Sequence, residues 1–423
     1  MFVNPWTLAL FLAPGAPALH RSSRMLIGLL DALFVITGIA LLTAPPATLR
    51  RVLPRVFTLA ISLLLSVLLI EGILRVLTPE SVFHPNLALY PYRNYALRVN
   101  LLGVSRTGRY TTNKWGMRGD PIPRNWSELT TVLTIGGSTT QCYYLSDDKT
   151  WPARLQQVLR RVDPKVMVQN AGLDGHSTRG HLLMMKEVVP VVKPKILVML
   201  VGMNDLSYSI DEQHLLLGNP NEMTGLGYYV FSHSRIVQLI YKWHQILVNR
   251  APIVEGNPDA KPTGHPRKPL LHPTPLPENI ETILPSLREF EANLGEIIRL
   301  AGREGVKLVI LTQPLLFDDT SEWDRIEWSA YWLQGQKYAI SAATLWKMQK
   351  IFNDRLLRIC RDRRVACFDL AAAIPHEQTY FYDSVHFNEA GSVRVAERLS
   401  DFLVKNGILA EIEGGSPEGR KTR

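Results

Sequence analysis

Short apolar runs rich in β-branched residues alternate with longer amphipathic stretches in this chain, and this alternation constrains its fold most. The apolar runs fall at residues 132–135, 166–169, 196–201, 307–311 and 365–370. The stretches with helical spacing fall at 151–161, 181–189, 284–303, 342–361 and 389–405. Near-continuous apolar strands separated by helices are typical of a parallel sheet that is buried on both faces. The sequence therefore predicts an α/β domain around a parallel five-stranded sheet.

The rest of the chain differs from this pattern at its N-terminal end, at two insertions and at its polar C-terminal end. We expect an irregular, aromatic-rich arm before the domain and a disordered tail after it. The predicted organisation is a membrane anchor at 1–79, the arm at 80–129, the α/β domain at 130–410 with insertions at 206–283 and 315–345, and the tail at 411–423.

The two insertions have different compositions. The first contains eight prolines between Pro252 and Pro277, so its later part should be extended and loop-like. In the second, Trp328, Tyr331 and Trp332 follow the spacing of one helix face. We interpret them as the core-packing face of an added helix. A lid or a sugar-stacking wall is the functional alternative.

The N-terminal region contains two apolar runs long enough to span a membrane. Residues 25–44 carry Asp31 as their only charge, and at 1.5 Å per residue they make about 30 Å of helix, one hydrocarbon thickness. The second run extends over 56–77. A signal peptide is the alternative for the first run, and a buried core helix is the alternative for the second. We predict two transmembrane helices.

The basic residues near these runs bear on membrane orientation. A short loop with Arg50, Arg51 and Arg55 should face the cytoplasm, which places everything after the second span outside it. Arg21 and Arg24 then fall on the opposite side and oppose this orientation. We expect a bacterial inner-membrane protein with an extracytoplasmic α/β domain.

The charge and cysteine content of the chain exclude several classes of protein. The chain has 47 Lys and Arg against 38 Asp and Glu without a block of like charges, so nucleic-acid binding is not indicated. Its three cysteines exclude a disulfide-rich scaffold and lack the spacing of metal ligands. We interpret Cys360 and Cys367 as free buried thiols, although they could pair in an oxidising compartment. No cofactor or metal is expected.

Chemistry in an open parallel sheet is sought just beyond the carboxyl ends of the strands. The first strand runs into Gly136-Gly137-Ser138, where two glycines allow a sharp turn and expose the hydroxyl of Ser138 at the start of a helix. The simpler interpretation is that Ser138 or Thr139 is an ordinary N-cap. A phosphate-binding loop would need a Gly-Lys-Ser/Thr ending, which is missing here.

Three later loops supply the other groups that an acyl-transfer site needs. Gly175 and Asn204 follow the second and third strands, and Asp383 and His386 lie in the last loop before the C-terminal helix. An imidazole must accept the serine proton, and a carboxylate must fix the imidazole tautomer. We therefore predict Ser138, His386 and Asp383 as the catalytic residues. The Ser138 N–H, the Gly175 N–H and the Asn204 amide are the predicted oxyanion-hole donors.

This order of Ser, Gly, Asn and His after successive strands resembles the SGNH (GDSL-type) hydrolase family. The resemblance covers residues 130–403 outside the insertions, and Gly175 is chosen because it lies five residues after Asn170. It implies a flavodoxin-like three-layer α/β/α fold and the site residues named above. The segment 113–119 also resembles the lead-in of membrane-anchored bacterial members. Gly137 stands where the family's Gly-Asp-Ser has its Asp.

These features predict a membrane-anchored serine esterase that forms an acyl-enzyme from an acyl ester. The resemblance and the membrane anchor point to an O-acetyl ester of an envelope glycan or lipid. An O-acyltransferase that modifies an exopolysaccharide with the same triad is the first alternative. A non-catalytic glycan-binding domain is the second, and the intact set of site motifs argues against it.

Overall fold

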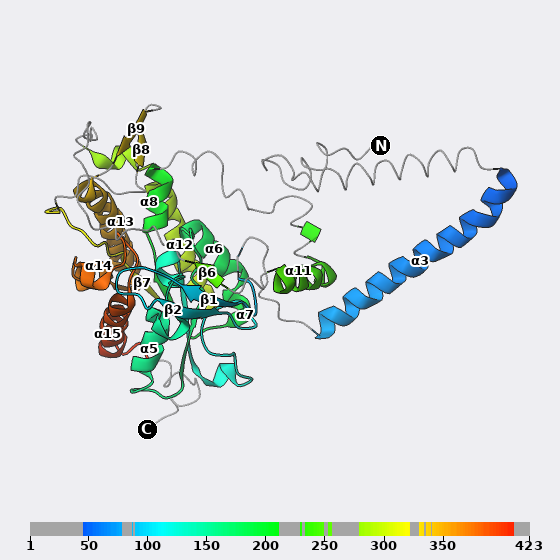
Figure 1. Ribbon diagram of the computed structural model, residues 1–423, viewed down its shortest axis with the longest axis horizontal. Coiled ribbons are helices and arrows are strands. Elements are labelled where there is room, and N and C mark those ends of the chain that lie inside the picture. Colours follow the sequence, from blue (N-terminus) through cyan, green and yellow to red (C-terminus); the bar gives the residue numbers. More distant parts are fainter. Residues whose placement is uncertain are drawn as a thin grey trace, which may run out of the picture. The chain divides into compact units, whose positions relative to one another are not determined.

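The structure is a computed structural model that describes most of the α/β domain and one N-terminal helix (Figure 1). The predicted first span at 25–44, the tail, most of the proline-rich stretch and Trp328 lie outside the described residues. The described residues are 45–77, 87, 89–210, 229–230, 233–248, 253–255, 279–321, 330–333, 336–339 and 341–409.

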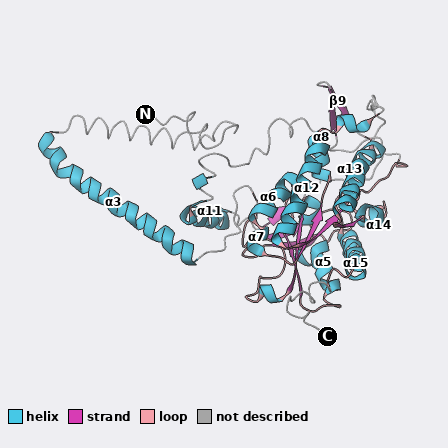
Figure 2. Ribbon diagram, turned by 180° about the vertical axis from the view of Figure 1, so that it is seen from behind, coloured by secondary structure: helices cyan, strands magenta, loops and turns pink. Residues whose placement is uncertain are grey.

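A five-stranded parallel sheet forms the centre of the domain, as predicted (Figure 2). Its strands, in spatial order, are β10 (Ala366–Phe368), β7 (Lys307–Leu311), β5 (Ile196–Leu200), β3 (Thr130–Gly136) and β4 (Val166–Asn170). This order of strands is the flavodoxin-like arrangement. The chain starts at β3, adds β4 on one side, and then returns to add β5, β7 and β10 on the other side, so the direction of strand addition reverses between β3 and β5. Ligands bind at such a reversal, so the loops after β3 and β5 are the first place to look for a site.

Helices cover both faces of the sheet, which confirms the predicted fold class. One layer contains α5 (Trp151–Leu159) packed on α15 (Glu389–Lys405), and the other contains α12 (Ser286–Glu304) packed on α6 (Thr178–Glu187) and α13 (Ala342–Arg363). The shorter helices are α4 (Ser138–Gln141), α7 (Val189–Val192), α8 (Met203–Ile210) and α14 (Leu370–Ala373). Single 3-10 turns occur at Trp126–Glu128, Asp147–Lys149, Ile280–Ile283 and Gln378–Tyr380.

Local chemistry explains where these elements begin and end. Every residue of β3 is buried, as expected for a strand between two helical layers. The side chains of Ser341 and Asn388 accept hydrogen bonds from the first turns of α13 and α15. Gly305 ends α12 with φ +67°, a conformation that glycine adopts without steric cost.

The arm is not irregular as predicted, because two of its segments pair as strands. β1 (Asn94–Arg98) is antiparallel to β2 (Thr107–Thr111), and β6 (Ile253–Glu255) from the first insertion adds a parallel strand to β1. The side chains of β1 alternate between exposed and buried. Tyr95 on the buried face stacks on Tyr110, with their ring centroids 5.7 Å apart.

Two further expectations are wrong. In the second insertion, β8 (Ala330–Leu333) and β9 (Gln336–Ala339) form an antiparallel pair instead of a helix, since Tyr and Trp favour strands as readily as they fill a helix face. Cys360 and Cys367 are not free thiols but form a disulfide, with Cα atoms 6.1 Å apart. It joins the end of α13 to β10, and such bonds persist in oxidising compartments.

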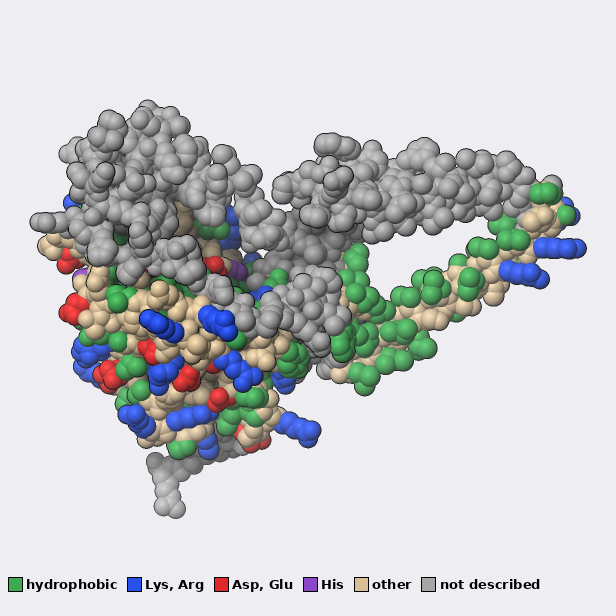
Figure 3. Space-filling view, in the orientation of Figure 1, with side chains coloured by type: hydrophobic (Ala, Val, Ile, Leu, Met, Phe, Trp, Pro, Cys, Tyr) green, Lys and Arg blue, Asp and Glu red, His purple; other side chains and the backbone are tan. Residues whose placement is uncertain are grey.

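The chain divides into two compact units, of which the smaller contains the long helix α3 (Pro46–Leu77). The predicted second span, 56–77, lies within it, but the helix begins earlier and includes the basic residues that the sequence assigned to a loop. By length and composition, residues Arg50–Leu77 are apolar enough to cross a membrane. Figure 3 shows hydrophobic side chains along this helix and arginines at one end. α11 (Arg235–Val248) follows in the first insertion.

Candidate active site

Ser138 lies two residues after the end of β3, at the first position of α4. Gly137 occupies the N-cap position, and Ser138 directs its hydroxyl to a histidine rather than to the helix backbone. Both glycines are required by close packing: a Cβ on Gly136 would lie 2.1 Å from the Thr140 hydroxyl, and one on Gly137 would lie 2.2 Å from the Asn204 amide nitrogen. The simple N-cap interpretation of Ser138 therefore does not describe this turn.

His386 and Asp383 come from the loop before α15 and meet Ser138 in a continuous hydrogen-bonded chain. His386 Nε2 lies 2.7 Å from Ser138 Oγ, and His386 Nδ1 lies 2.6 Å from Asp383 Oδ2. Asp383 Oδ1 accepts the backbone N–H groups of Val385 and His386, at 2.9 and 2.8 Å. These contacts fix the carboxylate, which in turn fixes which imidazole nitrogen faces the serine.

The charges around these three hydrogen-bonded side chains favour a basic imidazole. Burial alone would lower the pKa of His386, but the negative charge of Asp383, its hydrogen bond and the charge of Asp174 raise the pKa above its ordinary value. Burial alone would raise the pKa of Asp383, but His386 and the two backbone N–H groups lower it. The Tyr382 ring lies parallel to the imidazole, 5.4 Å away and tilted by only 3°, so it supports the imidazole's orientation.

The predicted oxyanion donors occupy different surroundings. A small recess is lined by Ser138 and Asn204 together with Gly137, Thr139, His176, Leu200, Val201, Gly202, Met203 and Gln313. The Asn204 amide also donates to the His176 carbonyl oxygen at 2.9 Å. Gly175 is exposed, with φ +73°, and is not among the lining residues of this recess. Its role therefore stays a prediction.

His176 lines the recess, and its ring packs against that of His181, with the ring centroids 6.4 Å apart. Burial lowers the pKa of His176 to about 4 and that of His181 to about 3, so both rings are neutral near pH 7. Asp205 is also buried and accepts hydrogen bonds from Thr178.

Arg118 is the residue whose importance the sequence did not reveal, although the segment 113–119 was recognised as a motif. It is 3% exposed and belongs to the arm. Its guanidinium donates to the carbonyl oxygens of Gln141, Cys142 and Leu145, at 2.8, 2.7 and 2.7 Å, and to Asp147 Oδ1. These acceptors belong to the end of α4 and the loop that follows it. Arg118 thus holds the segment after Ser138 in place.

No group of three or more His, Cys, Asp or Glu side chains among the described residues has an arrangement that could hold a metal ion.

The model of the GDSL-like lipase/acylhydrolase family matches residues 134–394, more than half of the chain. The chain belongs to this family. It is therefore a serine hydrolase that acts on ester bonds, which confirms the resemblance noted from the sequence. A comparison with curated proteins found no match.

Several solved structures are similar to the domain at low sequence identity. A lipolytic protein of the G-D-S-L family from Desulfitobacterium hafniense is 13% identical, with a TM-score of 0.36 over 65% of this chain and 99% of that chain. An acetylxylan esterase from Geobacillus stearothermophilus is 14% identical, with a TM-score of 0.38 over 65% of this chain and 94% of that chain. An α/β hydrolase from the metagenome of Lake Arreo is 14% identical, with a TM-score of 0.38 over 66% and 96% of the respective chains.

Proposed function

We propose that Ser138 is the nucleophile of this esterase, that His386 is its general base and that Asp383 orients the imidazole. The observation that carries the proposal is the hydrogen-bonded chain of 2.7 and 2.6 Å through the three side chains. A serine hydroxyl is a weak nucleophile until a neighbouring base accepts its proton, and His386 Nε2 is within reach of that proton.

The reaction proceeds in two halves. Ser138 Oγ attacks the ester carbonyl carbon as its proton moves to His386 Nε2, and the tetrahedral intermediate collapses when the alcohol leaves with that proton. Water then attacks the acyl-enzyme, gives a proton to His386, and the acid leaves as the proton returns to Ser138 Oγ. We assign stabilisation of the intermediate's oxyanion to the Ser138 N–H, the Asn204 amide and the Gly175 N–H.

We propose a short acyl group, with an O-acetyl ester of an envelope glycan or lipid as the substrate. The recess at Ser138 has a volume of only about 10 Å³, roughly that of a single water molecule by the same measure. A long acyl chain would need more room beside the nucleophile than this recess offers. An acetyl group adds only one methyl to the reacting carbonyl, so its demand for space is the smallest.

We propose an inner-membrane location with the α/β domain outside the cytoplasm. The apolar helix α3 supports the anchor, and the Cys360–Cys367 disulfide supports an oxidising compartment. α11 supports membrane contact as well. The first N–H groups of α11 donate to Glu71 near the end of α3, and these hydrogen bonds hold α11 next to the proposed membrane span. Ile240 and Trp243 on α11 are 63% and 58% exposed, as suits a helix at a lipid interface.

Covalent labelling of the full-length protein in detergent with a fluorophosphonate tests the nucleophile. We expect labelling of the wild type and of Ser105→Ala, an exposed-serine control, and none of Ser138→Ala. His386→Ala should label at least a hundredfold more slowly. A Ser138→Ala protein that labels normally would refute the assignment. With p-nitrophenyl acetate, acetate release measures hydrolysis, and acetyl appearing on an added glycan would indicate transfer instead.

A further inference from the structure

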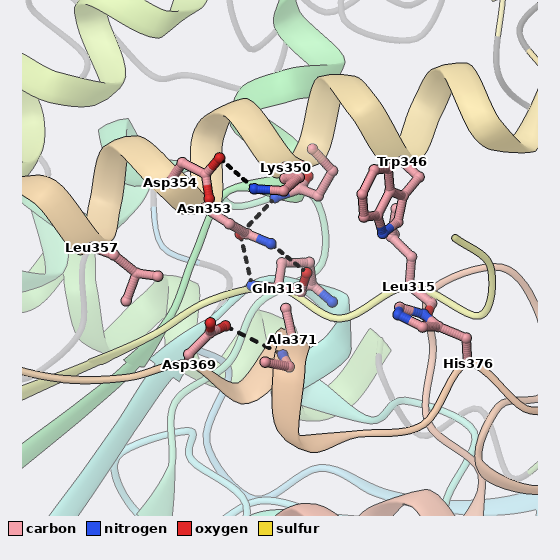
Figure 4. Close-up of a pocket in the computed structure, with 12 residues that line it drawn as sticks. Gln313, Leu315, Trp346, Lys350, Asn353, Asp354, Leu357, Asp369, Ala371 and His376 are labelled. Carbon is pink, nitrogen blue, oxygen red and sulfur yellow. Dashed lines mark hydrogen bonds and ion pairs between the residues drawn. The ribbon is translucent and has the colours of Figure 1, made fainter. Parts of the chain in front are cut away.

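A second pocket opens beside the catalytic recess, between α13 and the loops that follow β7 and α14 (Figure 4). Its volume is about 150 Å³. Trp346 and Lys350 line it from α13, Gln313 and Leu315 from the loop after β7, and His376 from the loop after α14. A cavity of about this size holds one six-membered ring such as benzene.

The lining combines apolar surface with hydrogen-bonding groups. The half-buried Trp346 ring points from α13 towards Leu315 and His376 (Figure 4). The Nδ1 atom of His376 contacts the Leu315 carbonyl oxygen at 2.8 Å, which leaves Nε2 for another partner. Gln349 is 1% exposed, and its Oε1 atom accepts no hydrogen bond from the described residues. Such a buried acceptor is costly unless a donor reaches it.

The charges in the pocket favour a neutral ligand. Lys350 is paired with Asp354 at 2.5 Å, so its positive charge is already balanced. The Asp369 carboxylate accepts the Thr312 hydroxyl at 2.8 Å and the Ala372 N–H at 3.2 Å. A phosphate or carboxylate would meet these acids without an unbalanced lysine or arginine among the lining residues. Hydroxyl groups, which both donate and accept hydrogen bonds, suit these surroundings better.

Gln313 connects this pocket to the catalytic recess, because it lines both. Its Oε1 atom accepts a 3.2 Å hydrogen bond from the hydroxyl of Thr139, the residue after the proposed nucleophile. Asn353 holds the Gln313 backbone with two hydrogen bonds of 3.0 Å. A group bound in the pocket is therefore separated from the reacting ester by the width of one side chain.

We propose that this pocket binds a single pyranose ring of the substrate, next to the sugar unit or linkage whose ester reaches Ser138. The proposal rests on the proposed esterase function. The C–H face of the ring packs on Trp346, while a hydroxyl of the ring reaches His376 Nε2. The pocket thus selects a glycan ester over a lipid ester, and it acts on binding rather than on the chemical step.

Two ester substrates distinguish an effect on this subsite from an effect on the proposed catalytic residues. Cellobiose with a single O-acetyl group presents a free pyranose ring next to the acetylated unit, whereas p-nitrophenyl acetate carries the same acyl group without a sugar. We expect Trp346→Ala to lower kcat/KM for cellobiose monoacetate at least tenfold, mainly through KM. The same variant should stay within twofold of the wild type on p-nitrophenyl acetate. Trp346→Phe should recover part of the loss, and Trp243→Ala, at an exposed tryptophan of the other unit, should change neither.

The outcomes distinguish this proposal from the proposed function. Equal losses on both esters, or an unchanged rate on cellobiose monoacetate, would overturn the sugar subsite alone. So would a wild type that hydrolyses p-nitrophenyl acetate but no acetylated sugar. If neither ester is hydrolysed and Ser138 does not label, the esterase assignment fails, and the subsite fails with it. Thermal unfolding of each variant verifies that it is folded.

Discussion

The guanidinium of Arg118 donates a 2.7 Å hydrogen bond to the carbonyl oxygen of Cys142. Cys142 ends the short helix α4 in a left-handed conformation, with φ +51°, which few side-chain-bearing residues adopt. The strained end of this helix is therefore held by a charged group from outside the α/β domain proper. Ser138 lies at the other end of the same four-residue helix, so its position depends on this contact.

Replacement of Arg118 with lysine should loosen the segment that follows Ser138. Lysine keeps the positive charge but lacks the planar guanidinium group, whose N–H donors bind several carbonyl oxygens at once. We expect a loss of about 2 kcal/mol in unfolding free energy, because hydrogen bonds from charged donors are lost in a buried site. Fluorophosphonate labelling should slow about tenfold. Arg160→Lys, at an exposed ion pair, should lose less than about 0.5 kcal/mol. Equal unfolding curves for both variants would contradict this role.

Asp174 should tune the pH dependence of the reaction. His386 must be neutral to accept a proton, so kcat/KM rises with pH through the apparent pKa of the His386–Asp383 pair. Because the charge of Asp174 helps to raise the pKa of His386, Asp174→Asn should move this rise to lower pH. The pH profile of p-nitrophenyl acetate hydrolysis measures the shift. Asp401→Asn removes an equal charge from the exposed face of α15 and should leave the profile in place; identical profiles for both variants would refute the prediction.

Asn204→Ala should slow the chemical step. Removal of one oxyanion-hole donor typically costs a factor of about 10² to 10³ in kcat. We expect a loss in this range with KM changed less than about threefold, because the donor acts on the intermediate more than on the bound ester. Steady-state kinetics with p-nitrophenyl acetate test this. Asn406→Ala, at the exposed end of α15, is the matched control. A rise in KM at constant kcat would assign Asn204 to substrate binding instead.

The Cys360–Cys367 disulfide should stabilise the edge of the sheet. Its short loop constrains the unfolded chain, and its removal should cost about 2 kcal/mol in unfolding free energy. Thermal unfolding with and without dithiothreitol measures this effect. The wild type should lose stability on reduction, whereas a Cys360→Ala/Cys367→Ala double variant should be insensitive. A wild type that is equally stable in both buffers would show that the bond contributes nothing.

The α/β domain could be predicted from the sequence because the apolar residues of its strands and helices follow clear and different periodicities. The predicted strands at 132–135 and 307–311 lie within β3 and β7, and the helix predicted at 389–405 has the bounds of α15. The predicted site residues Ser138, His386 and Asp383 also follow from order along the chain, because parallel strands bring their carboxyl ends to one edge of the sheet.

The remaining features depend on contacts between distant parts of the chain. Tyr331 and Trp332 have a spacing that fits a helix face, yet β8 and β9 pair instead, because aromatic residues fit either structure. Arg118 lies in a motif, but its acceptors are backbone carbonyl oxygens more than twenty residues away, which no side-chain pattern encodes. The strand pairing of β1 with β6 is likewise invisible in either segment alone.

The contact between Arg118 and the segment that follows Ser138 also sets the shortest useful fragment of this protein. The family match begins at residue 134, and a fragment cut there would lose Arg118 together with β1 and β2. Such a fragment would keep every proposed catalytic side chain but would lack the Arg118 guanidinium, which holds the backbone after Ser138 in place. Expression trials should therefore begin at Leu87, where the larger compact unit starts. Family boundaries and folding boundaries differ in this chain by nearly fifty residues.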